Sequence, residues 1–223
     1  MTLIVAHRGA SAYDVENSLS AFRLAAAMGA DGVELDIHVT ADGVPVVHHD
    51  PVAGRYPIWR TALEELRRHR LANGEPIPTL AEALETIGHD LQVFIEVKGL
   101  AERHDRALLE VLAAGTAPKR YAVHSFDHRI VHRLRQQHPE LSVGVLSTSY
   151  PIDPVRQARD AGAMRLWQQE SLVDDALISA CRAAEVLVYA WTVDESDRMR
   201  TLASLGVDAV CTNRPDFARE VLG

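Results

Sequence analysis

The sequence lacks long hydrophobic runs, a signal peptide and a cysteine pattern, and each absence excludes a class of protein. No apolar stretch approaches the roughly 20 residues that a membrane-spanning helix needs, so no stable membrane insertion is expected. The N-terminal stretch MTLIVAHRGA has no charged region before a long apolar run, so no signal peptide is expected either. The two cysteines, Cys181 and Cys211, form no CxxC pair. We interpret them as buried apolar residues of a reducing compartment, and we predict a cytoplasmic protein.

Positive charge is also scarce. The chain has 23 Lys and Arg residues against 31 Asp and Glu residues, for a formal net charge of −8. This balance argues against nucleic acid or an anionic membrane as a main partner. An anionic substrate would therefore need positive charge supplied locally by its site. The length of 223 residues suits one large domain, and no linker-like tract divides the chain, so a single domain 1–223 is predicted.

Short β-branched runs alternate with amphipathic stretches, a pattern that predicts a parallel sheet covered by helices. The expected strands are residues 3–8, 32–38, 44–49, 91–98, 121–125, 142–146, 163–167, 186–193 and 207–212. Helices are expected to begin at Thr61 and Thr79, each followed by glutamate in a capping box, at Asp153 before Pro154, and at Ser171 with Asp174. They are expected to end at Gly29, Gly88, Gly162 and Gly206.

The number of strands predicts the architecture. Segments 32–38 and 44–49 are separated only by VTADG, whereas neighbouring parallel strands need a crossover of roughly a dozen residues. The second segment should therefore return as an antiparallel hairpin. The remaining eight strands predict an α/β fold, a (β/α)₈ TIM barrel with a short antiparallel hairpin after strand two. The chain length is near the lower limit of about 200 residues for this fold.

Acidic side chains mark the ends of the second and third strands of the predicted barrel, where active sites of such barrels lie. Glu34 and Asp36 share one face of their strand, and Glu96 lies near the end of the next. Three converging carboxylates would repel one another without a cation. Because oxygen ligands favour hard ions, the sequence predicts a site for one divalent cation, Mg²⁺ or Ca²⁺.

Histidine and cationic residues are expected around the same point. His7 ends strand one, and the hairpin returns His49 beside the carboxylates, so this pair is a candidate general acid and base. Strand alternation should turn the adjacent His48 away. Arg8 and Lys98 supply the positive charge that suits a phosphate oxyanion. Each residue alone has an ordinary structural explanation, but their occurrence at three successive strand ends favours a functional one.

The chain resembles the glycerophosphodiester phosphodiesterases in an ordered series of motifs from Ile4 to about Asp216. These are AHRGAS, ENSLSAF, GADGVELDIHVTADGVPVVHHD, PIPTLAEAL, FIEVKG, HSFD, AWTVD and GVDAVCTNRPD. The resemblance implies a TIM barrel with a small hairpin insertion. It also implies a Mg²⁺- or Ca²⁺-dependent hydrolase that cleaves small-molecule glycerophosphodiesters to sn-glycerol 3-phosphate and an alcohol.

The resemblance also assigns roles to individual residues. The histidine pair of the family falls on His7 and His49, its metal carboxylates on Glu34, Asp36 and Glu96, and its phosphate-contacting residues on Arg8 and Lys98. The tryptophan of its WTVN motif falls on Trp191, which is expected to line the glycerol or alcohol side of the pocket. Three departures concern the substrate: Val15 replaces a proline, Asp194 replaces an amide, and a short PVAGRYPIW follows HHD.

The residues leave several alternatives open. The nucleophile is water or the 2-hydroxyl of the substrate, and either histidine can be the acid. A lysophospholipase D-type or phosphoinositol-type diesterase is an alternative within the class. A non-catalytic barrel that binds glycerol phosphate is an alternative outside it.

Overall fold

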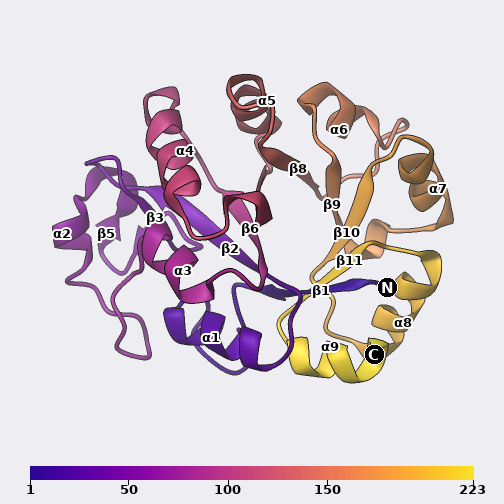
Figure 1. Cartoon of the computed structure of the whole chain (residues 1–223), viewed down its shortest axis with the longest axis horizontal. Coiled ribbons are helices and arrows are strands. Elements are labelled where there is room, and N and C mark those ends of the chain that lie inside the picture. The colour runs from indigo at the N-terminus through magenta and orange to yellow at the C-terminus, as the bar shows by residue number, and fades with distance from the viewer.

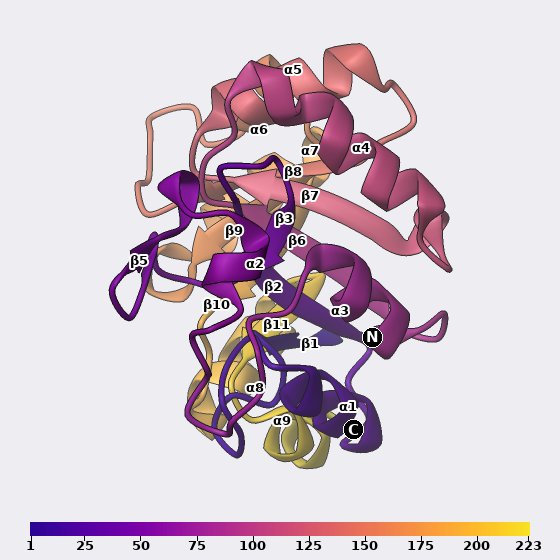
Figure 2. The same cartoon turned by 90° about the vertical axis from the view of Figure 1, so that its left-hand side faces the viewer.

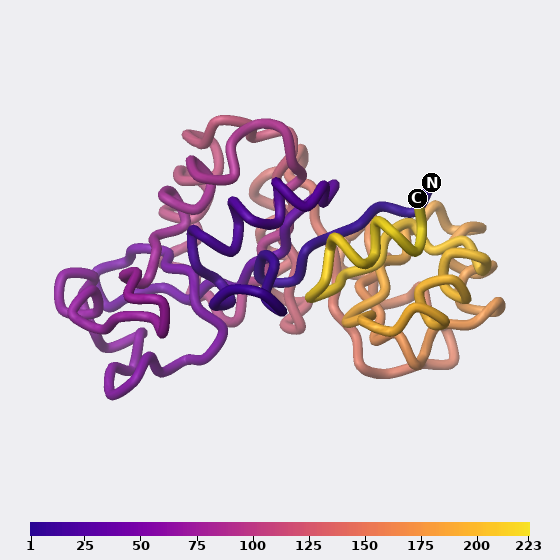
Figure 3. The backbone as a smooth tube through the Cα atoms, turned by 90° about the horizontal axis from the view of Figure 1, so that it is seen from below, coloured from indigo at the N-terminus to yellow at the C-terminus, as the bar shows by residue number.

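Eight parallel strands close into a barrel in the computed structural model, which describes residues 1–223 (Figure 1). The strands are β1 (Leu3–His7), β2 (Gly32–Val39), β6 (Gln92–Val97), β7 (Tyr121–Ser125), β8 (Ser142–Ser147), β9 (Arg165–Gln169), β10 (Leu187–Trp191) and β11 (Ala209–Thr212). Strand β1 pairs in parallel with both β2 and β11, which closes the barrel. Figure 3 shows the two chain ends near each other, as this pairing requires. The predicted (β/α)₈ fold is confirmed.

The hairpin after strand two is also confirmed. Strand β3 (Pro45–Val47) runs antiparallel to the end of β2, with Ile37 opposite Val47. A small insertion follows, made of β4 (Val52–Ala53), β5 (Tyr56–Pro57), the 3₁₀ helix η1 (Ile58–Arg60) and α2 (Leu63–Leu66). Figure 2 shows this insertion at the side of the barrel. Its residues pack around a cluster of their own, formed by Val46, Ala53, Ile58, Leu66 and Ile77.

Helices cover the outside of the barrel. They are α1 (Leu19–Ala27), α3 (Leu80–Ile87), α4 (Asp105–Ala114), α5 (His128–Gln137), α6 (Arg156–Ala161), α7 (Asp175–Ala183), α8 (Ser196–Leu205) and α9 (Pro215–Leu222), with 3₁₀ helices η2 (Glu102–His104), η3 (Pro118–Arg120) and η4 (Glu170–Leu172). The predicted ends hold: Gly88, Gly162 and Gly206 are C-caps, and Gly29 follows the C-cap Met28. None of the helices combines the length and apolar character that crossing a membrane requires.

Of the four predicted helix starts, only that at Thr79 is correct. Its side chain and that of Glu82 form the expected capping box of α3. The prediction at Thr61 was wrong, because its hydroxyl donates to the carbonyl of Pro57 and α2 begins one residue later, after Ala62. The other two starts lie a few residues too early. Val155 rather than Asp153 precedes α6, and Asp174 rather than Ser171 caps α7.

The barrel interior is packed with side chains and forms the floor of its C-terminal end. The interior cluster consists of Val5, Phe94, Ala122, Leu146, Trp167, Tyr189, Ala209 and Cys211. Phe94 and Trp167 meet edge to face, with ring centroids 5.2 Å apart. Gly32 makes room for this aromatic layer, since a Cβ there would lie 2.9 Å from the Phe94 ring. Both cysteines are free and buried, as predicted.

Candidate active site

A cavity of about 90 Å³ lies at the C-terminal ends of the strands, above the aromatic floor. It is lined by His7, Arg8, Glu34, His49, Glu96, Lys98, His124, Phe126, Leu146, Trp167, Trp191 and Cys211. The lining includes every predicted site residue except Asp36, whose side chain is fully buried. Strand ends that lie far apart in the sequence therefore bring the predicted groups to one place.

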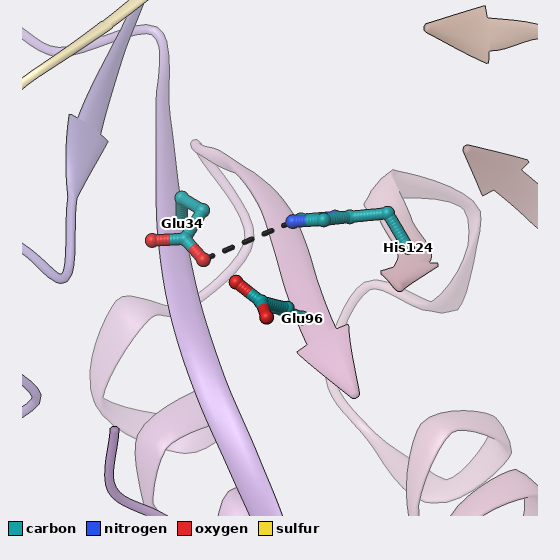
Figure 4. Close-up of side chains that lie close together, drawn as sticks. All are labelled: Glu34, Glu96 and His124. Carbon is teal, nitrogen blue, oxygen red and sulfur yellow. Dashed lines mark ion pairs between the residues drawn. The ribbon is translucent and has the colours of Figure 1, made fainter. Parts of the chain in front are cut away.

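Three buried side chains at this cavity could hold a metal ion. Glu34 on β2, Glu96 on β6 and His124 on β7 point toward one another (Figure 4). One ligand atom from each lies within 4.8 Å of the others, and His124 Nε2 is 3.8 Å from Glu34 Oε1. Sequence reasoning missed His124 as a candidate. The strand pattern could have found it, because β7 follows β6 in the barrel and its register sets His124 opposite Glu96.

The electrostatics of this group favour a bound cation. Burial raises the pKa of Glu34 well above its usual range, and the charges of Asp36 and Glu96 raise it further. Burial and the charge of Asp36 raise the pKa of Glu96 to about 7. Burial lowers the pKa of His124 to about 3, so its ring is neutral. A divalent cation would relieve the carboxylate repulsion, and a neutral imidazole can serve as a ligand beside them.

Asp36 has a different environment from Glu34 and Glu96. Burial opposes its ionisation, but the ion pairs with Lys98 and Arg8 outweigh burial and lower its pKa to about 2. Its Oδ1 lies 2.9 Å from Lys98 Nζ, while Arg8 Nε and the Asn17 amide lie 3.1 and 2.9 Å from its Oδ2. Lys98 Nζ also lies 2.7 Å from Glu96 Oε1. Asp36 therefore anchors the two cations of the cavity in this structure.

A tight turn directs Arg8 toward the cavity. Its φ is +55°, and that of Gly9 is +82°. The turn needs glycine because a Cβ at position 9 would lie 2.8 Å from Ala21. The Arg8 guanidinium also lies 2.9 Å from Glu16 Oε2, which remains beside it although Val15 replaces the usual proline. The turn at Gly9 thus places Arg8 in the lining of the cavity.

The His7 ring is held by a side chain from the far end of the sequence. Its Nδ1 lies 2.7 Å from Asn213 Oδ1. Burial lowers the pKa of His7, as does the neighbouring charge of Arg8, although this hydrogen bond opposes both. A lowered pKa leaves the ring neutral near pH 7, which suits a proton acceptor. Sequence reasoning did not identify Asn213, which follows β11.

The two adjacent histidines after the hairpin lie in different places. His49 lines the cavity and His48 does not. The His49 Nδ1 lies 2.8 Å from Asp50 Oδ1, and His38 Nε2 lies 3.0 Å from the backbone carbonyl of His49. His38 is not among the predicted site residues. The structure shows that its ring contacts the segment that carries His49.

Aromatic rings form the remaining wall of the cavity. Trp191 and Phe126 meet edge to face, with centroids 5.6 Å apart and an interplanar angle of 77°. Phe126 is 46% exposed, so it lies at the rim. The Trp191 Nε1 is buried without a hydrogen-bond partner, which leaves a donor for a ligand oxygen. This wall can contact an organic part of a substrate, whereas the opposite side is ionic.

Comparisons with known proteins agree with this geometry. The sequence profile of the Glycerophosphoryl diester phosphodiesterase family matches residues 7–217. A glycerophosphodiester phosphodiesterase of Caldanaerobacter subterraneus subsp. tengcongensis is 32% identical over 96% of this chain and 95% of its own. A probable glycerophosphodiester phosphodiesterase 2 of Mycobacterium tuberculosis is 30% identical over 99% of this chain and 90% of its own.

Solved structures give the same result. A phosphodiesterase of Oleispira antarctica, in complex with the product sn-glycerol-3-phosphate, superposes with a TM-score of 0.90 at 28% identity, covering 100% of this chain and 97% of that one. A glycerophosphodiester phosphodiesterase of Parabacteroides distasonis has the same TM-score at 24% identity, covers 99% and 96% of the two chains, and supports the fold. The chain belongs to the glycerophosphoryl diester phosphodiesterase family.

Proposed function

We propose that the chain hydrolyses glycerophosphodiesters to sn-glycerol 3-phosphate and an alcohol, with His7 and His49 as general acid and base. One observation carries the proposal: both histidines line the same small cavity as two cations and two buried carboxylates. The product bound to the Oleispira antarctica relative supports the same substrate class. Because the family profile spans residues 7–217, we also propose that the chain acts as one domain.

The cations are suited to binding the phosphoryl group. Arg8 and Lys98 line the cavity, and both belong to ion pairs around Asp36. Those ion pairs raise the pKa of each cation against the opposing effect of burial, so both stay charged. Arginine can bridge two phosphoryl oxygens through its planar fork, while lysine adds a point charge. Together they provide locally the positive charge that the whole chain lacks.

Glu34, Asp36 and Glu96 are the proposed ligands of one Mg²⁺ or Ca²⁺ ion, whose charge would stabilise the phosphoryl oxygens. The raised pKa values of Glu34 and Glu96 support this fit. Lys98 Nζ lies beside one oxygen of both Asp36 and Glu96, so a bound cation would compete with Lys98 for these two carboxylates. His124 is an alternative third ligand, and its nitrogen would shift the preference toward Mn²⁺ or Zn²⁺.

The histidines perform the proton transfers. One removes a proton from the nucleophile, and the other donates a proton to the leaving alkoxide, so that charge does not build up on either oxygen. The nucleophile is water or the 2-hydroxyl of the substrate. In the second case a cyclic phosphate forms, and the histidines exchange roles to hydrolyse it. Trp191 and Phe126 contact the glycerol or alcohol part.

Glycerophosphocholine, assayed with coupled detection of glycerol 3-phosphate, tests the proposal. The enzyme should release glycerol 3-phosphate when Mg²⁺ or Ca²⁺ is present, and His7→Ala and His49→Ala should each abolish most of that release. Hydrolysis of lysophospholipid or glycerophosphoinositol with no turnover of glycerophosphocholine would favour the alternative diesterases. Tight binding of glycerol 3-phosphate without turnover of any diester would indicate a non-catalytic barrel.

A further inference from the structure

We propose that Asp194 is a positioning residue that acts through Asn213 to keep the proton of neutral His7 on Nδ1. The three side chains form a hydrogen-bonded series that ends at the cavity. The role of the His7 ring as a general base rests on the proposed function. The arrangement of protons within the series follows from the geometry alone.

Three donors converge on the Asp194 carboxylate. Its Oδ1 accepts from the Thr212 hydroxyl and from the backbone N–H of Asn213, both at 2.8 Å. Its Oδ2 accepts from the Asn213 amide nitrogen at 2.6 Å. A carboxylate only accepts hydrogen bonds, so it fixes which end of the Asn213 amide faces it. The amide nitrogen faces Asp194, and the amide oxygen faces the opposite way.

The amide oxygen in turn fixes the His7 ring. Asn213 Oδ1 lies 2.7 Å from His7 Nδ1 and 2.8 Å from the Ser11 hydroxyl. An amide oxygen cannot donate, so His7 Nδ1 must be the donor. A neutral imidazole has one N–H, and the lone pair is therefore on Nε2. That atom is the one left for the cavity that His7 lines, and it is the atom a general base needs.

The variant Asp194→Asn should reverse the orientation of the Asn213 amide, with almost no change in the shape of the side chain at position 194. The backbone N–H of Asn213 cannot turn, so the oxygen of the introduced amide should face it and the nitrogen of that amide should face the Asn213 side chain. Two amide nitrogens would then oppose each other. The Asn213 amide can relieve this by rotating half a turn, which presents its nitrogen to His7 Nδ1. The ring must then accept at Nδ1 and carry its proton on Nε2.

Two-bond ¹H–¹⁵N correlation of the full chain measures this directly, with His7 assigned by comparison with the His7→Gln protein. At a pH above the ordinary histidine range, the unaltered protein should show the Nδ1–H form of His7. The Asp194→Asn protein should show the Nε2–H form. Because the family motif WTVN carries an amide at this position, an asparagine here is compatible with turnover, and the tautomer of His7 is the decisive measurement.

Ser11→Ala is the matched control for the tautomer of the His7 ring. It removes the second hydrogen bond to Asn213 Oδ1 but leaves Asp194 in place, so His7 should keep its proton on Nδ1. An unchanged His7 tautomer in Asp194→Asn, or an Nε2–H form in the unaltered protein, would overturn the proposal. If the unaltered protein turns over no glycerophosphodiester, the proposed function fails, whereas the tautomer measurement still tests Asp194.

Discussion

At the scale of single residues, two neighbouring histidines with identical chemistry differ only in direction. His49 lines the cavity, whereas the His48 Nδ1 lies 2.9 Å from the backbone carbonyl of Asp50 and its ring is outside the lining. We predict that His49→Ala lowers kcat for glycerophosphocholine by roughly 10²–10⁴-fold. His48→Ala is the control and should change kcat much less. Equal losses in steady-state assays, or a greater loss at His48, would contradict this orientation.

A substitution at Arg8 tests whether binding of the phosphoryl group needs the planar guanidinium or only a positive charge. Lysine keeps the charge but cannot bridge two phosphoryl oxygens, nor can it contact Glu16 and Asp36 at once as Arg8 does. We predict that Arg8→Lys lowers kcat and kcat/KM together, the pattern of a contact strongest in the transition state. Glu16→Gln is the control, because it breaks only the exposed ion pair. Full activity of Arg8→Lys with unchanged KM would make Arg8 a structural residue.

Apart from His124, which lies at a strand end like the predicted residues, the residues that the sequence predicted differ in kind from those it missed. His7, Glu34 and Glu96 lie at strand ends, and strand alternation together with the barrel rule is enough to place them at one site. Asn17 and Asn213 act through hydrogen bonds to strands distant in the sequence, and no periodicity encodes such pairs. Asp36 was predicted as a metal ligand beside Glu34 and Glu96. Its ion pair with Lys98, however, depends on side-chain directions that strand patterns do not specify.

At the scale of elements, strand existence was easier to predict than helix starts. All the expected strands occur in the structure. Buried parallel strands are rich in β-branched residues, so their sequence pattern is easy to recognise. A capping residue gives a weaker pattern, since threonine hydroxyls and aspartate carboxylates serve turns as well as helices. Thr61 donates to the carbonyl of Pro57 in the insertion, and Asp153 accepts from the backbone of Val155 before α6 begins.

The capping box of α3 allows a stability prediction. The Thr79 hydroxyl accepts from the Glu82 backbone N–H, and the Glu82 side chain accepts from the Thr79 backbone N–H. We predict that Thr79→Ala lowers the free energy of unfolding by about 1 kcal/mol. Urea denaturation measures this change. Thr79→Ser keeps the hydroxyl and should cost less. A serine variant as unstable as the alanine variant would show that the buried methyl group, and not the cap, stabilises this position.

At the scale of the whole molecule, the barrel gathers ionisable side chains at the cavity, where the burial of their charge opposes folding. The aromatic floor excludes water from below, and the ring of strands brings Glu34, Glu96 and His124 into one buried group. Burying like charges opposes folding unless a cation joins them. Lys98 pairs with Asp36 and Glu96, and Arg8 pairs with Asp36 and Glu16, so neither cation forms an ion pair with Glu34. We infer that the metal-free protein is less stable than the metal-bound one, by an amount that depends on pH.

The direction of this dependence follows from the raised pKa of Glu96. Its pKa is about 7 in the folded protein, against 4.5 ordinarily, so folding favours the protonated form. In the metal-free protein, Glu96 therefore lowers stability progressively as pH rises from about 4.5 to about 7, and the full penalty applies above that range. His7, His38 and His124 act in the opposite direction, because their lowered pKa values make folding less favourable as pH falls below 6.5. A comparison at each pH is needed to separate the two effects.

We therefore predict that the rise in melting temperature caused by saturating Mg²⁺ or Ca²⁺, relative to EDTA, increases as pH is raised from about 4.5 to about 7, where Glu96 ionises, and that the ionisation of Glu34, whose pKa is also raised, adds to this increase. A cation binds the ionised carboxylate, and below pH 7 it must first displace the proton that the folded protein holds there. The contributions of His7 and His38, which are not proposed ligands, are present with and without metal and largely cancel in this difference. Glu96→Gln is the matched control, since it keeps the shape of the side chain but removes the charge and the proton. It should abolish the part of the metal-induced rise and of its pH dependence that comes from Glu96, whereas the contribution of Glu34 should stay. A rise of equal size at every pH in the unaltered protein would show that the cation binds away from Glu96.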